Sequence, residues 1–110
     1  MGSTSWSLSG SNDERRDVSR ATVSIEAELR RTGRTAYKVE VRDLSATGCR
    51  ADTLSKVVVG DRIWLTIPGF SAIEGIIRWV SPRDFGIEWN RPIHPSIFDF
   101  IRQRYPELVI

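Results

Sequence analysis

Two short polar stretches of the chain carry side chains that could bind a phosphorylated ligand. The first, Arg15-Arg16-Asp17-Val18-Ser19-Arg20, places arginines at positions 15, 16 and 20. The second, Asp43-Leu44-Ser45-Ala46-Thr47-Gly48, combines a carboxylate, a hydroxyl and a glycine. Guanidinium groups bind phosphate oxygens or the O6 and N7 edge of guanine through paired hydrogen bonds, and a carboxylate can accept from guanine N1 and N2. Together the two stretches would suit a guanine nucleotide.

Each stretch taken alone also has an ordinary structural explanation. Arg16 and Arg20 could be solvated charges that flank a strand. Asp43 and Ser45 could bond to their own backbone in a turn, where Gly48 would supply a positive φ. The choice between a binding site and a turn therefore depends on whether the fold brings the two stretches together.

The rest of the chain offers few groups for catalysis. His94 is the only histidine and precedes Pro95 at an expected helix start, where a histidine caps or packs more often than it acts as a base. Cys49 is the only cysteine, so the chain has neither an intrachain disulfide pair nor clustered soft metal ligands. No glycine-rich loop of the kind that cradles phosphate opens a helix. We therefore expect a binding protein that is not an enzyme and has no metal site and no cofactor.

Length and composition indicate one globular domain. The 110 residues suffice for a single modest core, and 40% hydrophobic with 27% charged residues is ordinary for such a domain. A net charge of +2 does not supply the cationic field that drives non-specific binding to duplex nucleic acid. With one cysteine, no apolar run of membrane-spanning length and no secretory signal, we expect a cytoplasmic location.

Alternation of apolar and polar residues predicts strands along most of the chain. Residues 22–30 and 37–43 form two such runs around a turn at 31–34, which predicts a hairpin that leads directly into Asp43. Gly75 lies inside a later run, where a bulge or a close backbone approach is expected. The remaining strands are expected at 49–53, 62–67, 72–80 and 85–89, between turn signals such as Gly60-Asp61 and Pro68-Gly69.

After the last strand the period changes to that of a helix. Pro95 suits a first helical turn, and Pro106 ends the run. The side chains expected on its apolar face are Ile97, Phe98, Ile101 and Tyr105. Six short strands and one helix predict a mainly β fold, a six-stranded antiparallel β-barrel with the C-terminal α-helix covering one opening or flank. We expect a flexible tail at 1–14, the domain at 15–106 with its helix at 95–105, and a tail at 107–110.

The two polar stretches also resemble the marks of a known family. Arg16-Asp17-Val18-Ser19-Arg20 matches an RxxxR segment, and Asp43 to Gly48 matches the (D/N)xSxxG segment that follows it in PilZ domains. Arg15 corresponds to the extra arginine often found before the first motif. The resemblance extends from about Arg15 to Tyr105, which is nearly the whole chain.

The resemblance implies a split-barrel type of fold that binds the bacterial second messenger cyclic di-GMP without catalysing a reaction. The ligand-binding residues that it implies are Arg15, Arg16, Arg20, Asp43, Ser45 and Gly48. The arginines would bind guanine edges and phosphates, Asp43 and Ser45 would contact guanine from the barrel side, and Gly48 would permit a close turn. A ligand held by the N-terminal arm would change the surface shown to a downstream protein partner.

Two alternatives remain open from the sequence. Some PilZ domains bind a protein and have little affinity for the nucleotide. A barrel of this kind could also bind single-stranded nucleic acid through Trp64, Trp79 or Trp89 and nearby arginines, although the composition makes nucleic acid the less expected partner.

Overall fold

The computed structural model describes residues 20–105, and these form a closed barrel with one helix. The strands are β2 (Arg20–Arg31), β3 (Tyr37–Ser45), β4 (Gly48–Asp52), β5 (Arg62–Thr66), β6 (Ile73–Val80) and β7 (Phe85–Trp89), and the helix is α1 (Pro95–Arg104). All neighbouring strands are antiparallel, in the order β2-β3-β4-β7-β6-β5. The predicted fold class is confirmed. Within the described residues, no helix is long and apolar enough to cross a membrane.

Closure of the barrel depends on two contacts between strands that are distant in sequence. The long strand β2 bends, with a register irregularity between Thr22 and Ile25, and so pairs with β3 along most of its length and with β5 near its end. The short strand β4 pairs with β7 from Gly48 opposite Glu88 to Ala51 opposite Phe85. Because every strand has two neighbours, the barrel leaves no open sheet edge.

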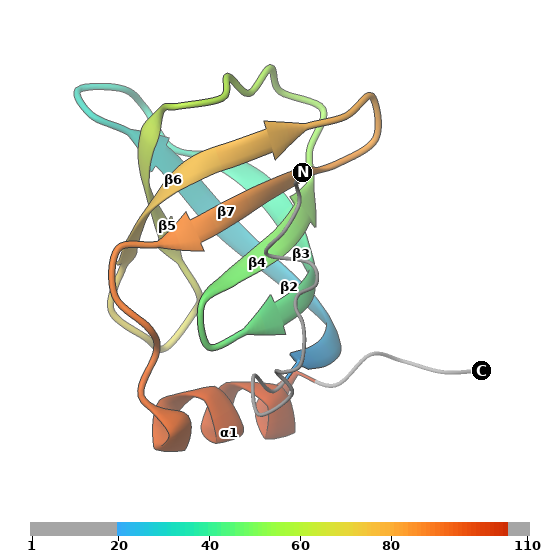
Figure 1. The fold of residues 1–110 in the computed structure, drawn as a ribbon, viewed down its shortest axis with the longest axis vertical. Coiled ribbons are helices and arrows are strands. Elements are labelled where there is room, and N and C mark those ends of the chain that lie inside the picture. The colour runs from blue at the N-terminus through green and yellow to red at the C-terminus, as the bar shows by residue number, and fades with distance from the viewer. Residues whose placement is uncertain (1–19, 106–110) are drawn as a thin grey trace.

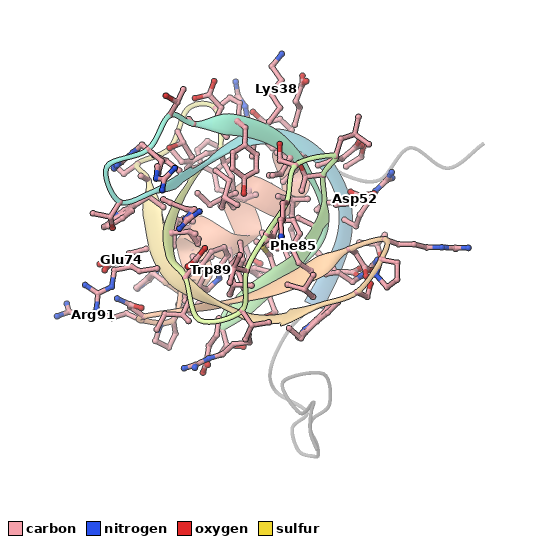
Figure 2. All side chains as sticks on the ribbon, turned by 90° about the horizontal axis from the view of Figure 1, so that it is seen from above. Lys38, Asp52, Glu74, Phe85, Trp89 and Arg91 are labelled. Atoms are coloured by element: carbon pink, nitrogen blue, oxygen red, sulfur yellow. The ribbon has the colours of Figure 1, made fainter. Side chains whose placement is uncertain are left out.

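The alternating apolar residues point into the barrel and form a single core. Buried side chains include Ile25, Leu29, Val41, Leu65 and Ile87, each with an exposed fraction of 0%. Figure 2 looks along the barrel and shows Phe85 and Trp89 within the ring, whereas Lys38 and Arg91 project outward. The alternation in the sequence therefore correctly predicts which side chains face the inside of the barrel and which face outward.

Helix α1 covers one end of the barrel (Figure 1). The imidazole of His94 accepts a hydrogen bond from the backbone N–H of Ser96 at 3.1 Å, so this histidine caps the helix. Phe98 and Ile101 are buried, and the hydroxyl of Tyr105 donates to the carbonyl of Pro68 at 3.1 Å. Ile97 was expected on the same face but is 41% exposed, because it lies at the margin of the contact between helix and barrel.

Local details of two other predictions differ from the structure. Gly75 pairs in register with both neighbours, and the irregularity of β6 lies between Ile77 and Trp79. Of the two expected possibilities, a bulge or a close backbone approach, the structure has the second: a Cβ on Gly75 would lie 2.6 Å from the carbonyl oxygen of Glu88. Helix α1 ends at Arg104, one residue before the predicted end. The predicted tails at 1–14 and 107–110, together with Arg15 and Arg16, lie outside the described residues.

Candidate functional site

The pairing of β2 with β3 brings the ends of the two polar stretches side by side. Arg20 is the first residue of β2 and lies opposite Ser45, and Thr22 lies opposite Asp43. Arg20, the last residue of the arginine stretch, therefore lies beside the (D/N)xSxxG segment although the two are separated by more than twenty residues. This juxtaposition follows from the hairpin register, which the apolar alternation on both strands sets.

Asp43 projects from the outer face of the barrel into an ion pair with Arg50. Its Oδ2 accepts a hydrogen bond from Arg50 Nε at 2.7 Å, and the two residues are cross-strand neighbours on β3 and β4. The Asp43 side chain is only 17% exposed. The carboxylate is therefore held in one orientation at the rim of the candidate site.

Arg50 also bonds a second carboxylate. Its Nη1 donates to Asp84 Oδ2 at 2.9 Å, and the Ser81 hydroxyl donates to the other carboxylate oxygen of Asp84. Burial alone would lower the pKa of the Arg50 guanidinium, but the hydrogen bonds to Asp84 and Asp43 and the negative charges of these two carboxylates together outweigh burial and raise it. Arg50 is thus a permanent cation that joins the candidate site to the turn between β6 and β7.

Arg50 did not stand out in the sequence. It lies two residues after Gly48, on an outward position of β4, and this spacing is the one signal that places it on the same face as the motif. Its partner Asp84 lies 34 residues further along the chain. Such a separation cannot be bridged by local sequence reasoning.

The hydroxyl of Ser45 holds the turn between β3 and β4. Its Oγ accepts hydrogen bonds from the backbone N–H groups of Thr47 and Gly48, at 3.2 and 3.1 Å, and it lies 3.2 Å from the Gly48 carbonyl oxygen. Ser45 is 2% exposed. Ser45 is therefore a turn residue bonded to its own backbone, which is one of the two roles considered from the sequence. Its contact with a ligand stays a prediction.

Gly48 is required for a different reason from the one considered in the sequence. It does not have a positive φ, because the glycines with positive φ among the described residues are Gly33, Gly60 and Gly69. A Cβ on Gly48 would instead collide with the carbonyl oxygen of Ile87 on β7. Gly48 therefore lets β4 approach β7 closely at the edge of the candidate site.

The turn that carries the motif is fastened to the segment that leads into α1. The backbone N–H of Trp89 donates to the Thr47 carbonyl at 2.9 Å, and that of Ile93 donates to the Ala46 carbonyl at 2.7 Å. The indole Nε1 of Trp89 donates to the Ser45 carbonyl at 3.3 Å from inside the barrel. These bonds satisfy three successive carbonyls of the turn, so the site is built on a fixed backbone.

An aromatic surface lies beside the ion pair. Arg50 and Trp79 both lie opposite Gly86, on the two strands that flank β7. The Trp79 indole occupies the place where a side chain on residue 86 would be, and it remains partly exposed. A partly exposed indole next to an aspartate and an arginine can stack against a planar base. The sequence suggested Trp79 only as a possible contact for single-stranded nucleic acid and not as a residue of the cyclic di-GMP site.

The other two tryptophans are less available for stacking. Trp89 is 4% exposed and belongs to the core. Trp64 lies under the guanidinium of Arg30, whose Cζ is 4.9 Å from the ring centroid. Of the three tryptophans considered for nucleic-acid binding, Trp79 alone is partly exposed next to the candidate site.

The family model for the PilZ domain matches residues 14–103. The chain belongs to the PilZ domain family. PilZ domains are in general receptors for cyclic di-GMP and act as binding modules rather than catalysts. The match includes both polar stretches and all the strands of the barrel.

Several solved structures share the fold of this PilZ domain, and they include the following two. The Bacillus subtilis inhibitor of motility (MotI/DgrA) superposes with a TM-score of 0.59 at 15% identity, covering 82% of this chain and 48% of that one. The chain thus spans about half the length of that protein. The PilZ domain of CeSA from a cellulose-synthesizing bacterium gives a TM-score of 0.57 at 16% identity, covering 77% and 93%. No curated protein matches the sequence.

Proposed function

We propose that this PilZ domain binds cyclic di-GMP on the outer face of the barrel, where β2 begins and β3 ends. The observation that carries the proposal is the register that places Arg20 opposite Ser45 and Thr22 opposite Asp43. Cyclic di-GMP is a bacterial intracellular messenger, so the proposal includes a cytoplasmic location.

The roles of the side chains follow from their chemistry. Arg15, Arg16 and Arg20 bind the phosphates and the O6 and N7 edges of guanine, as guanidinium groups do. Asp43 accepts from guanine N1 and N2, in an orientation set by Arg50. Trp79 offers a ring face for one base. Ser45 and Gly48 shape the turn, and Ser45 contacts the ligand only if its hydroxyl turns away from the Gly48 carbonyl.

Calorimetry with cyclic di-GMP tests the proposal. Arg20→Ala removes a charge-assisted contact worth roughly 1.5 to 3 kcal/mol, so affinity is expected to fall about tenfold or more. Arg34→Ala is the matched control, because Arg34 lies in the turn between β2 and β3 and is not part of the candidate site. Wild-type affinity in the Arg20 variant would remove the arginine stretch from the site.

Base reading is tested separately with cyclic di-AMP. Adenine lacks the adjacent N1 and N2 donors of guanine, so wild-type protein is expected to bind cyclic di-AMP poorly. Asp43→Ala is expected to reduce the difference in affinity between cyclic di-GMP and cyclic di-AMP. Equal binding of both by wild-type protein would leave only attraction to phosphate. Binding of neither would favour the alternative of a PilZ-type module that recognises a protein without nucleotide.

We also propose that ligand binding fixes the arginine stretch and so alters the surface shown to a partner. Arg15, Arg16 and Arg20 can contact one nucleotide together only in a single backbone arrangement, so binding should order residues 15–20. Amide hydrogen exchange should then show added protection at 15–20 and 43–48 in the presence of cyclic di-GMP. Added protection at 43–48 but not at 15–20 would show that the nucleotide binds the site without ordering the arginine stretch, which would then carry no signal.

A further inference from the structure

A cluster of exposed apolar side chains surrounds the end of the barrel opposite α1. The connection from β4 to β5, residues 53–61, crosses this end and runs beside the β6–β7 turn, residues 81–84 (Figures 1 and 2). Leu54 is fully exposed. Val58, Val59 and Val80 are also exposed. Four large aliphatic side chains in water at one end of a small barrel are more than scattered surface residues, and such patches mark interaction sites.

The same end of the barrel has a hollow that could receive a side chain. It measures about 380 Å³ and is bounded by the two loops, with Leu54, Val57, Val80, Pro82 and Phe85 among its lining residues. A lipid surface needs only protruding apolar side chains, whereas a bounded hollow suits an apolar side chain of a protein segment. The shape therefore favours a protein over a membrane.

The charges around the hollow indicate the chemistry of the partner. Its charged lining residues are Lys56, Arg83 and Asp84. Among residues 20–105 neither cation makes an ion pair, although the charge of Arg83 acts on the neighbouring carboxylate of Asp84. The carboxylates on or next to the same loops each face an arginine of the barrel: Asp52 faces Arg42, Asp61 faces Arg31, and Asp84 faces Arg50. The hollow therefore carries two exposed cations against one carboxylate that Arg50 already binds, and this excess of positive charge is complementary to an acidic segment with an apolar anchor.

We propose that this end of the barrel is a docking surface for a protein segment that inserts an apolar side chain between Leu54 and Val80 and places carboxylates against Lys56 and Arg83. The inference deepens the proposed function by naming the surface and the class of partner, and it involves none of the proposed nucleotide-binding side chains. The β6–β7 turn that forms one wall is held by Arg50, which also holds Asp43, so the surface is directly connected to the candidate site.

A larger hollow at the other end of the barrel gives no comparable indication. A groove of about 750 Å³ beside α1 is lined by apolar residues that include Phe70, Ile93 and Ile97. Its two charged lining residues, Glu74 and Arg91, have opposite signs. Neither charge nor shape therefore identifies what would bind there.

Three synthetic peptides test the docking surface by amide chemical-shift mapping on the full chain without nucleotide. The first has two leucines flanked by glutamates, the second replaces the glutamates with lysines, and the third replaces the leucines with serines. We expect the first peptide alone to bind, with shifts concentrated at residues 53–59 and 80–84. Equal binding of the acidic and basic peptides, or shifts centred elsewhere, would overturn the proposal.

Variants make the test specific. Leu54→Ser is expected to weaken binding of the acidic peptide about tenfold or more, since it removes most of one buried leucine contact. Its matched control is Ile97→Ser at the other end of the barrel, which should bind as wild type. The double variant Lys56→Glu with Arg83→Glu should reverse the preference and bind the basic peptide. Both cations are exposed, so neither change should disturb the fold.

One further outcome, with lipid vesicles, would also overturn the proposal. Vesicles of equal parts phosphatidylcholine and phosphatidylserine provide the lipid arm of the experiment. If the wild type sediments with these vesicles, the Leu54 variant does not, and no peptide binds, the surface is a lipid-binding one and the proposal fails. Because every arm omits nucleotide, a failure here is separate from a failure of cyclic di-GMP binding in calorimetry.

Discussion

Single residues at the candidate site act mainly through their contacts with neighbouring strands. Asp43 is held by Arg50, the Ser45 hydroxyl is bonded within its own turn, and Gly48 admits the backbone of β7. Two of the three motif residues on the barrel therefore have structural tasks that operate without any ligand. This explains how a binding motif can also be a folding motif.

Gly48→Ala should destabilise the barrel, because its Cβ would collide with the Ile87 carbonyl, which is backbone and cannot swing away. The expected loss is roughly 1 to 3 kcal/mol of unfolding free energy, measured by urea denaturation. Gly33→Ala is the control: it has a φ of 70° and no atom near an added Cβ, so it bears only backbone strain of about 1 kcal/mol. A smaller loss at Gly48 than at Gly33 would contradict the close approach.

The carboxyl of Asp84 should make stability depend on acid pH. Burial alone would raise its pKa, but hydrogen bonds from Ser81 and Arg50 together with the charges of Arg50 and Arg83 outweigh burial and lower it. The unfolded state then binds the proton more readily, so this contribution is complete above the ordinary aspartate pKa of about 4 and is lost as pH falls through the lower folded value. Denaturation at pH 7 and pH 3 should show a smaller pH-dependent loss for Asp84→Asn than for wild type. An equal loss in both proteins would assign the acid sensitivity to other carboxyls.

At the scale of elements, α1 stabilises the barrel through one face. Phe98 is 4% exposed, whereas Phe100, two residues later, is 55% exposed and contacts Phe70 edge to face, with ring centroids 5.6 Å apart. The helix is short, so its stability must come from packing rather than from its own hydrogen bonds. It closes the end of the barrel that carries the candidate site.

The two phenylalanines form a matched pair for measurement. Phe98→Ala should cost about 3 to 5 kcal/mol of unfolding free energy, because it leaves a cavity between helix and barrel. Phe100→Ala should cost about 1 kcal/mol, since the ring is largely in solvent and loses one aromatic contact. Thermal melts of both variants check the difference. Similar losses of unfolding free energy would mean that α1 does not stabilise the barrel mainly through Phe98.

At the scale of the whole molecule, closure of the barrel shields its centre from solvent. Cys49 is completely buried on β4, and burial raises the pKa of its thiol far above the usual value. The neutral thiol is a poor nucleophile, so the folded barrel protects it both sterically and electrostatically.

A thiol reagent should therefore report opening of the barrel. Labelling of Cys49 is expected to be very slow in buffer and fast in denaturant, with a rate in buffer that follows the unfolding equilibrium. Gly48→Ala, which weakens the adjacent contact of β4 with β7, should speed labelling in proportion to its loss of stability. Rapid labelling of the wild type without denaturant would show that β4 separates from β7 in the native state.

Much of this architecture could be predicted because its signals are local. Alternating residues such as Val23, Ile25 and Ala27 mark a strand within a few positions, and Pro68-Gly69 marks a turn. The two motifs also follow from short spacings, and the hairpin of β2 and β3 brings their ends together by local pairing alone. Fold class and the positions of Arg20, Asp43 and Ser45 were therefore within reach of the sequence.

Tertiary structure alone decided what surrounds those residues. The partners of Arg50 and the strand that Gly48 meets depend on the pairing of β4 with β7, two strands that lie far apart in the sequence. The position of Trp79 over Gly86 depends on the register irregularity of β6 against β7. Register between such strands is set when the barrel closes around its core, and no short sequence pattern encodes it. The sequence determined which chemical groups are available at the site, and closure of the barrel determined which of them meet.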